Sequence, residues 1–253
     1  MRLEDQAIVI TGATGIAASS AAHAVAEGAR VFVISIDESE CQDLASDIDI
    51  AGYAVADLTD ESAANDALKA AIDTLGGMDG LLAVAGGSGR RFGDGPLHEL
   101  GLGAWEKTLA LNTTPVFLAA RAAIGAMREG GGSIVLLSSV LATRPVPELF
   151  ATHAYAAAKG AVNALVTTLA SYYAPNRIRV NGIAPGLVRT PMSERAAKDP
   201  ATVEYALRKQ PVTPGFLGPD AVADAAVFLL SGESAQVTGQ VLAVDGGWSV
   251  TEA

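Results

Sequence analysis

The sequence predicts an α/β fold, with a doubly wound parallel sheet of about seven strands and helices on both of its faces. Short runs rich in β-branched residues alternate along the chain with longer alanine-rich stretches. The short runs are apolar throughout, as expected for parallel strands covered on both sides. Half of the 253 residues are hydrophobic and no linker divides the chain, so one domain over residues 1–253 is expected.

Each strand is predicted at a short apolar run, and each helix at the alanine-rich stretch that follows it. The expected strands are Ala7–Ile10, Val31–Ser35, Ala54–Ala56, Gly80–Val84, Ser133–Leu137, Arg179–Ile183 and Val241–Val244. The expected helices are Ile16–Glu27, Glu38–Asp47, Ala63–Leu75, Ala104–Met127, Thr152–Tyr173 and Asp220–Ser231. This alternation predicts right-handed crossovers between parallel strands of one sheet.

Two stretches are expected to lack regular structure. The glycine-rich stretch Gly86–Gly95 follows a strand and is interpreted as a loop. The stretch Met192–Gly218 contains Pro200, Pro211 and Pro214, and it is expected to form a lid or a substrate loop.

The composition excludes several functional classes. The net charge of −11 has the wrong sign for a nucleic-acid partner and also disfavours anionic membranes. Cys41 is the single cysteine, so no internal disulfide and no thiolate metal cluster is expected. The histidines and acidic residues show no metal-ligand spacing, so no metal site is expected.

Targeting and membrane-spanning segments are not expected. Residues Met1–Gln6 are too polar, and the apolar run after them is too short, for a signal peptide. No segment reaches the roughly 18 apolar residues that span a membrane. These features predict a soluble, cytoplasmic protein.

The turn after the first strand has the residues of a phosphate-binding loop. Ligands of doubly wound sheets bind at the carboxyl ends of the strands. Gly12 permits a tight turn there, and Gly15 lets the backbone approach a pyrophosphate at the start of the next helix. After the third strand, Asp57 can accept a hydrogen bond from an adenine amine. After the fourth, Gly86 leaves room for a ligand against the backbone.

A tyrosine and a lysine lie four residues apart in an alanine-rich predicted helix. This spacing places Tyr155 and Lys159 on the same helical face. A cation beside a phenol favours the phenolate, which would let Tyr155 exchange a proton near neutral pH. Such a pair suits an oxidoreductase that acts on carbonyl compounds and alcohols, although an ordinary surface pair has the same spacing.

Taken in order, the motifs resemble those of the short-chain dehydrogenase/reductase family over essentially the whole chain. The matching segments are TGATGIA, DL, AVAGG, LLSSV, YAAAK, RVNGIAPGLVRTPM and VTGQVLAVDGG. The resemblance implies a Rossmann-like fold, a nicotinamide cofactor and a catalytic group of four residues. The cofactor-binding positions that it implies are Gly12, Thr14, Gly15, Ile16, Ser35, Asp57, Leu58, Ala85, Gly86, Tyr155, Lys159, Pro185, Gly186, Val188 and Thr190.

Three departures from the family pattern concern the site. Only two residues separate Gly12 from Gly15, where the commonest branch has three. The usual Asn-Asn-Ala-Gly is replaced by Ala-Val-Ala-Gly ending at Gly86, so an amide that braces the central strand is absent. The catalytic serine usually precedes the tyrosine by thirteen residues, a position that Ala142 occupies here.

Alignment on the fifth strand assigns the serine role to Ser139, with the extra residues in the proline-containing loop Arg144–Phe150. Ser138 and Thr143 are the alternatives. The resemblance gives Tyr155 proton transfer, and Ser139 the stabilisation of charge on the substrate oxygen.

The remaining roles also follow from the resemblance. Lys159 would lower the pKa of Tyr155 and bind the nicotinamide ribose. Asn112 would hold a water molecule that connects Lys159 to solvent, and Thr190 would bind the nicotinamide carboxamide. His153 is expected at a helix start in the pocket wall, without a catalytic role.

Cofactor preference depends on the end of the second strand, where an acid favours NAD and a basic residue NADP. Ser35 occupies this position, and Asp37 and Glu38 follow it, so NAD(H) is favoured over NADP(H). Arg90 and Arg91 would reverse the preference if they reached a cofactor phosphate. They could instead meet an anionic substrate or remain solvated.

The function predicted is hydride transfer between a nicotinamide cofactor and a secondary alcohol or ketone. The alternatives are an epimerase or dehydratase on the same fold, and a cofactor-sensing protein without turnover. Apolar residues on more than one face of Ala104–Met127 and Thr152–Tyr173 indicate subunit contacts. With Trp248 near the C-terminus, they predict a homotetramer, or a dimer as the fallback.

Overall fold

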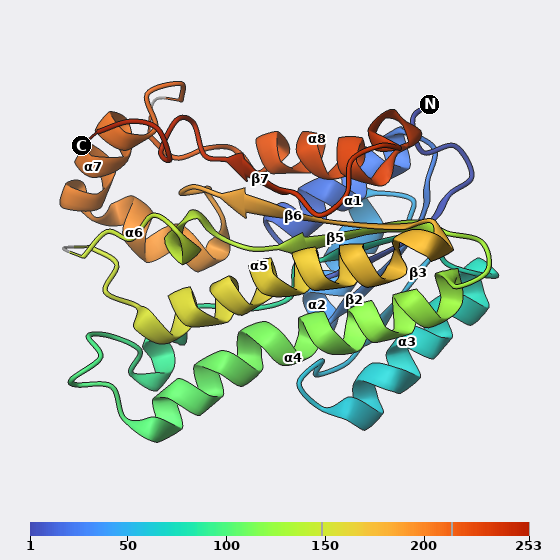
Figure 1. Cartoon of the computed structure of the whole chain (residues 1–253), viewed down its shortest axis with the longest axis horizontal. Coiled ribbons are helices and arrows are strands. Elements are labelled where there is room, and N and C mark those ends of the chain that lie inside the picture. The colour runs from blue at the N-terminus through green and yellow to red at the C-terminus, as the bar shows by residue number, and fades with distance from the viewer. Residues whose placement is uncertain (148, 214, 253) are drawn as a thin grey trace.

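The computed structural model describes residues 1–147, 149–213 and 215–252, and within them it confirms the predicted doubly wound sheet (Figure 1). Seven parallel strands lie in the order β3-β2-β1-β4-β5-β6-β7. The strands are β1 Ala7–Thr11, β2 Arg30–Ser35, β3 Gly52–Val55, β4 Gly80–Ala83, β5 Gly132–Leu137, β6 Ile178–Pro185 and β7 Val241–Val244. Every predicted strand is present, with ends shifted by a few residues at most.

The helices of the described residues cover both faces of this sheet. They are α1 Ile16–Ala26, α2 Glu38–Asp47, α3 Glu61–Leu75, α4 Leu102–Met127, α5 His153–Tyr173, α6 Glu194–Lys198, α7 Pro200–Lys209 and α8 Pro219–Leu230. Short 3₁₀ turns lie at η1 Gly89–Phe92, η2 Val140–Ala142, η3 Ala174–Asn176, η4 Pro191–Ser193 and η5 Gly232–Ser234.

Strand β1 lies at the point where the strand order of the sheet reverses. It pairs with β2 on one side and with β4 on the other, so Thr11 is in register with both Ile34 and Ala83. The loops that leave β1 and β4 therefore diverge at the carboxyl edge of the sheet, and the resulting crevice is where such folds bind ligands.

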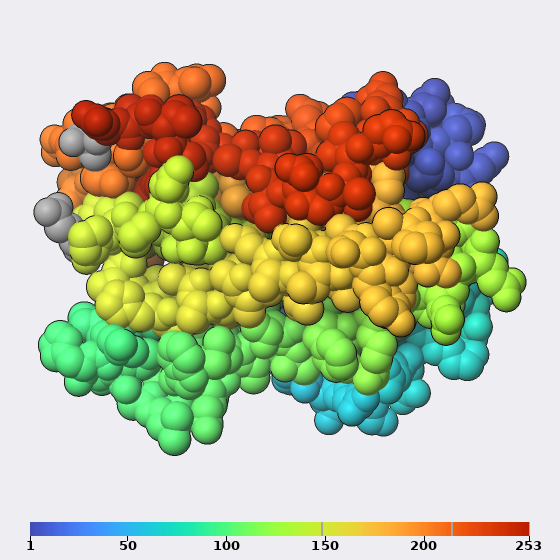
Figure 2. Space-filling model, in the orientation of Figure 1, coloured from blue at the N-terminus to red at the C-terminus, as the bar shows by residue number. Residues whose placement is uncertain are grey.

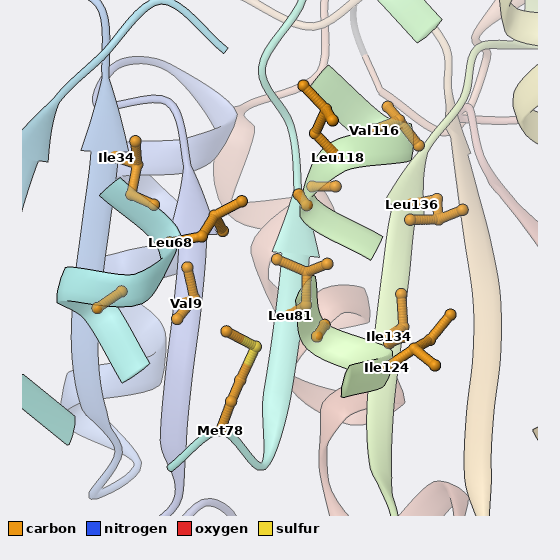
Figure 3. Close-up of a cluster of buried hydrophobic side chains, with 14 of the residues drawn as sticks. Val9, Ile34, Leu68, Met78, Leu81, Val116, Leu118, Ile124, Ile134 and Leu136 are labelled. Carbon is orange, nitrogen blue, oxygen red and sulfur yellow. The ribbon is translucent and has the colours of Figure 1, made fainter. Parts of the chain in front are cut away.

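Alternate residues of the strands enter two separate cores. Val9, Leu81 and Ile134 pack against α3, α4 and α5, in the cluster that Figure 3 shows. Their neighbours Ile8 and Leu82 point to the other face, which α1, α2 and α8 cover. Burial on both faces explains why the strand sequences are apolar throughout.

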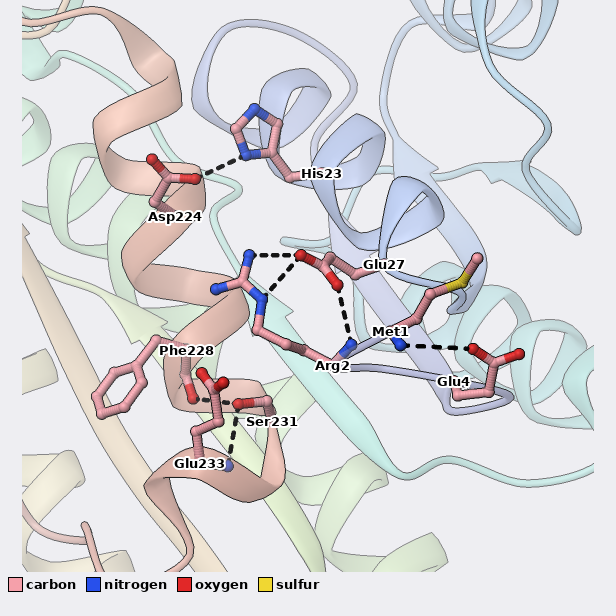
Figure 4. Close-up of polar contacts among 9 residues, drawn as sticks. All are labelled: Met1, Arg2, Glu4, His23, Glu27, Asp224, Phe228, Ser231 and Glu233. Atoms are coloured by element: carbon pink, nitrogen blue, oxygen red, sulfur yellow. Dashed lines mark hydrogen bonds and ion pairs between the residues drawn. The ribbon is translucent and has the colours of Figure 1, made fainter.

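Polar contacts fix the helices on the second face (Figure 4). Glu27, just after α1, accepts hydrogen bonds from the backbone N and the Nε of Arg2 at 2.9 and 2.8 Å. Nδ1 of His23 on α1 lies 3.1 Å from Oδ1 of Asp224 on α8. These contacts are partly exposed, so they set the position of α1 and α8 more than they add stability.

The prediction of an irregular Met192–Gly218 was wrong in its first half, because α6 and α7 lie there. Pro191 and Pro200 each stand at the start of a helical turn, where proline has no N–H to lose. Asp199 caps α7 by accepting from the Thr202 amide at 3.2 Å. Pro214 lies outside the described residues.

Helix α4 is the one helix of the described chain that is long and apolar enough to cross a membrane by length and composition. The expectation that no segment would pass this test was therefore too strict. Val116, Leu118 and Ile124 of α4 are buried against the sheet, which accounts for its apolar character.

Trp248 is buried, which corrects its predicted place at a subunit interface. Its side chain is 1% exposed and packs edge-on against Tyr205, with ring centroids 5.4 Å apart. Phe150 lies on it as well, at 6.5 Å. These residues close a small third core beside the cavity described below.

Candidate active site

A groove of about 500 Å³ opens at the carboxyl ends of β1 to β4. It is lined by predicted cofactor residues from all four of the loops that leave these strands. They are Gly12, Thr14, Ser35, Asp57, Leu58, Ala85 and Gly86.

The glycine turn has the geometry that an anion-binding loop needs. Gly12 and Gly15 both have positive φ angles, of 99° and 54°. A Cβ on Gly15 would lie 2.9 Å from the Cβ of Thr190, so a side chain does not fit there. Helix α1 begins without a side-chain cap and without an acid in its first turn, which leaves its amides available for a phosphate. The short spacing from Gly12 to Gly15 therefore still fits a dinucleotide.

A threonine replaces the missing amide brace after β4. The hydroxyl of Thr11 accepts hydrogen bonds from the Val84 and Ala85 amides, each at 3.0 Å. This contact joins the ends of β1 and β4 at the bottom of the crevice.

Asn112 fixes the glycine-rich loop from the other side. Its Oδ1 accepts from the Gly87 amide at 3.1 Å, and its Nδ2 donates to the Gly87 carbonyl at 2.9 Å. The side chain is fully buried, and a Cβ on Gly86 would lie 2.8 Å from Oδ1. These two bonds mean that the Asn112 side chain braces this loop. Pro115, one turn along the helix, lines the groove and has no N–H to donate to the Leu111 carbonyl.

A second cavity, of about 180 Å³, adjoins the first and contains the candidate catalytic residues. Of the predicted residues it is lined by Ile16, Ser139, Tyr155, Pro185, Gly186, Val188 and Thr190. Lys159 lies beneath it and is 3% exposed. The two cavities together bring the predicted residues to one edge of the sheet.

Tyr155, Ser139 and Lys159 form one polar group between β5 and α5. Ser139 and Tyr155 both line the cavity, and the Ser139 hydroxyl favours the ionised form of the Tyr155 phenol. The Nζ of Lys159 lies 5.8 Å from the centre of the Tyr155 ring and donates to the Leu137 carbonyl at 2.7 Å.

Burial controls the titration of this group. It raises the pKa of Tyr155 to about 12, which the hydrogen bond from Ser139 partly opposes. Burial also lowers the pKa of Lys159 to about 8. Burial is therefore the main influence on the pKa of Tyr155 in this structure, and the lowering of that pKa by Lys159 stays a prediction. Desolvation disfavours the charged forms of both residues, and the ammonium donates to the Leu137 carbonyl.

The alternatives for the serine position have different surroundings. The Ser138 hydroxyl donates to the carbonyl of Lys159 at 3.3 Å, so it faces the backbone of α5. Thr143 is exposed and is not in the cavity wall. Of these three hydroxyls, that of Ser139 is the one that acts on the pKa of Tyr155.

A buried carboxylate that the sequence did not reveal holds the start of α5. Both oxygens of Asp94 accept hydrogen bonds there, from the Ala154 amide at 3.0 Å and the Tyr155 amide at 2.9 Å. Asp94 is 6% exposed and lies sixty residues before Ala154 in the chain. The N-cap residue Thr152 makes no such bond, so the capping is entirely non-local.

Four further side chains reach the cavities. Glu40 lines the groove, with Oε2 3.5 Å from the hydroxyl of Ser35. Arg91 lines the groove, whereas Arg90 and Arg195 line the catalytic cavity. Of these, Glu40 and Arg195 were not predicted, because helical turns bring them back to the site. His153 begins α5 as expected but is exposed and outside the cavity wall.

Comparison with known proteins agrees with this fold. A family model described as "Enoyl-(Acyl carrier protein) reductase" matches residues 11–249. The chain is 35% identical to 2-(S)-hydroxypropyl-CoM dehydrogenase 3 of Xanthobacter autotrophicus, over 97% of each chain. It is 39% identical to a protein of the same organism named inactive 2-(S)-hydroxypropyl-CoM dehydrogenase 2, over 88% of this chain and 96% of that one.

The fold is likewise similar to that of solved structures. One is the 3-ketoacyl-(acyl-carrier-protein) reductase from Brucella melitensis complexed with NADH, with a TM-score of 0.86 and 27% identity. The match covers 98% of this chain and 100% of that one. The chain belongs to the short-chain dehydrogenase/reductase family and is an NAD(P)-dependent oxidoreductase that acts on CH–OH and C=O groups.

Proposed function

We propose that the protein transfers a hydride between NAD(H) and a small secondary alcohol or ketone, with Tyr155, Ser139, Lys159 and Asn112 as its catalytic group. The observation that carries this proposal is that Ser139 and Tyr155 lie together in the wall of the cavity that adjoins the groove. The nicotinamide ring, when bound, supplies or accepts the hydride. Gly12, Thr14 and Gly15 would hold the pyrophosphate, and Thr190 and Val188 would border the nicotinamide.

In the direction of reduction, Tyr155 supplies the proton. Because burial raises its pKa to about 12, the phenol is protonated at neutral pH and can donate to a carbonyl oxygen. The Ser139 hydroxyl lies beside it to stabilise negative charge on that oxygen. In oxidation Tyr155 must first lose its proton, and a protonated Lys159 favours that loss. Below its pKa of about 8, Lys159 is mainly charged and gives this assistance.

In this proposal Asn112 is a positioning residue for the loop at Gly87. Its side chain is fully used in holding Gly87 and the Thr108 carbonyl, which fixes the loop over the groove. A water molecule relaying protons from Lys159 would have to be held by the backbone around it.

The preference for NAD rests on the charges near Ser35. The Glu40 carboxylate is close enough to the Ser35 hydroxyl to take the place of the missing acid. Asp37 lies nearby, and the Ser39 hydroxyl and the Glu40 amide hold the pKa of its carboxyl below the ordinary value. Both charges would repel a 2′-phosphate. Arg91 is the opposing charge, but its guanidinium packs on the Phe92 ring at 4.7 Å.

A homotetramer and a cytoplasmic location also belong to this proposal, for one domain over residues 1–253. Helices α4 and α5 lie side by side across the face shown in Figure 2. Phe117 on α4 is 50% exposed and Tyr172 on α5 is 75% exposed. The edge strand β7 exposes Val241 and Leu242 by 37% and 40%. Water-exposed apolar residues on two helices and on one sheet edge fit two kinds of subunit contact.

A cofactor-binding protein without turnover is the second candidate. It is favoured by the relative that is named inactive. Measuring nicotinamide absorbance with a panel of ketones and alcohols separates the two functions, since only the enzyme consumes cofactor.

We predict that Tyr155→Phe abolishes turnover and leaves the Kd for NADH within a few-fold of wild type. The substitution removes the proton donor and keeps the ring. Steady-state rates and fluorescence titration measure the two effects. Tyr172→Phe, an exposed change on the same helix, is the control and should behave as wild type. Normal turnover in Tyr155→Phe would refute the catalytic assignment.

Ser139→Ala is expected to lower kcat by roughly 100-fold, since one donor to the developing oxyanion is lost. Ser138→Ala and Thr143→Ala should change kcat by much less, because neither hydroxyl contacts Tyr155. Parallel kcat measurements on the three variants test this. If Thr143→Ala were the most damaging, the serine assignment would be wrong.

We expect NADH to bind at least about 10-fold more tightly than NADPH, because carboxylates near the ribose repel an added phosphate. Glu40→Gln should narrow this ratio, whereas Glu38→Gln, outside the groove wall, should not. Fluorescence titration of both cofactors gives the ratio. Tighter binding of NADPH would overturn the preference and indicate Arg91 as the phosphate ligand.

Asp94→Ala is expected to lower kcat about 10-fold, on the order of the energy of one lost charge-assisted hydrogen bond, without weakening cofactor binding. Asp94→Asn should recover part of the loss, since it keeps one acceptor. Asp60→Ala removes the comparable cap of α3 and is the control. It should cost about 1 kcal/mol of unfolding free energy and leave kcat unchanged. An equal loss of kcat in both alanine variants would mean that Asp94 contributes stability alone.

A further inference from the structure

The wall of the catalytic cavity has a charge opposite to that of the protein. The chain contains 28 acidic and 17 basic residues. Among the described residues that line this cavity, however, the charged ones are Arg90 and Arg195, and none is an aspartate or a glutamate. An uncharged substrate gives no reason for this inversion.

Arg90 is held in place by its loop. The Ser88 hydroxyl accepts from the Arg90 amide at 3.3 Å and starts the turn η1. Gly89 packs so closely that an added Cβ would lie 2.3 Å from the Thr108 hydroxyl. The Nη2 of Arg90 donates to the Leu149 carbonyl at 2.8 Å, which leaves its other N–H groups available.

Arg195 reaches the same cavity from α6. The turn before α6 is fixed by Ser193, which accepts from the Thr190 amide at 2.9 Å and donates to the Val188 carbonyl at 2.6 Å. Val188, Thr190 and Ser193 themselves line the cavity. The N-terminal end of α6 is thus part of the wall that also contains the candidate nicotinamide contacts.

The two guanidinium groups lack a carboxylate partner of their own. Across the described part of the chain, neither forms an ion pair within 4.0 Å. Burial lowers the pKa of Arg90, the charge of Arg195 adds to this, and Asp94 opposes it. Both oxygens of Asp94 are already bonded to amides of α5.

Asp199, an acid whose pKa Arg195 influences, is also engaged elsewhere. Its carboxylate accepts a hydrogen bond from the Thr202 hydroxyl at 2.5 Å. This bond lowers the pKa of the Asp199 carboxyl most, and Arg195 lowers it least. Two like charges that face one cavity repel each other unless an anion lies between them.

We propose that the substrate is a small ketone or secondary alcohol with an oxyanion substituent (carboxylate, sulfonate or phosphonate), which Arg90 and Arg195 bind while its reacting oxygen contacts Ser139 and Tyr155. Guanidinium groups suit planar or tetrahedral oxyanions, because their N–H donors form a fixed fork. Val140, Phe150 and Trp248 form an apolar part of the wall, which suits a short hydrocarbon between the two polar groups of the substrate. This inference rests on the proposed function.

Matched pairs of substrates test the inference. We expect acetoacetate, levulinate or acetonylphosphonate to be reduced with a kcat/KM at least about 10-fold above that of its methyl ester. The advantage should fall as salt rises, because the contact is ionic and both arginines are exposed to solvent. Equal kcat/KM for each acid and its ester would overturn the inference and leave the reaction itself established.

Single substitutions identify the groups responsible. Arg195→Gln and Arg90→Gln should each lower kcat/KM for the preferred acid about 10- to 100-fold and leave that for the ester unchanged. Arg208→Gln, on α7 and paired with Glu204 on the surface, is the charge-matched control and should change neither. Equal loss for acid and ester would show that the arginines have a general structural role.

A binding measurement decides the inference even if no ketone is turned over. Calorimetric titration of the NAD-loaded protein with butanoate should give a Kd at least about 10-fold lower than with butyramide, and Arg195→Gln should remove the difference. Equal binding of the two probes refutes the anionic substrate. Absent turnover with selective butanoate binding would instead refute only the proposed reaction.

Discussion

The contact between the end of β5 and the start of α5 is the constraint on which the candidate site depends. Lys159 donates across it to Leu137, Ser138 donates back to the carbonyl of Lys159, and the hydroxyls of Ser139 and Tyr155 meet in the cavity. Two of these bonds use backbone carbonyls, so the strand end and the helix are fixed before any ligand binds. Asp94 adds a third anchor, from the loop after β4, and a distortion of that loop would therefore reach Tyr155 through the helix backbone.

The same packing disfavours the ionised forms of Lys159 and Tyr155. A buried ammonium and a buried phenolate both lose hydration, which is why the pKa values of Lys159 and Tyr155 move toward their neutral forms. A site with these values is prepared for protonating a carbonyl at neutral pH. Oxidation of an alcohol needs additional positive charge near the phenol, and binding of an oxidised nicotinamide cofactor is the event that would bring it.

The parts of the structure that were predictable have local causes. Strands buried on both faces are apolar throughout, and the turn at Gly12 and Gly15 needs positive φ angles that glycine supplies. The parts that were missed depend on contacts between distant residues or on the environment. Asp94 caps a helix sixty residues away, and Arg195 enters the cavity only because a helix begins after Pro191. The raised pKa of Tyr155 follows from burial, which the spacing to Lys159 does not reveal.

The distribution of charge connects these observations to specificity. Glu40 lines the groove near the end of β2, with Asp37 close to it in the chain, whereas Arg90 and Arg195 line the catalytic cavity. A strongly acidic surface repels free anions in solution, so an anionic substrate gains little from long-range attraction. Its recognition must instead come from short contacts at the cavity wall, where the Leu149 carbonyl positions Arg90. Selectivity in such a site depends more on how long the ligand stays than on how fast it arrives.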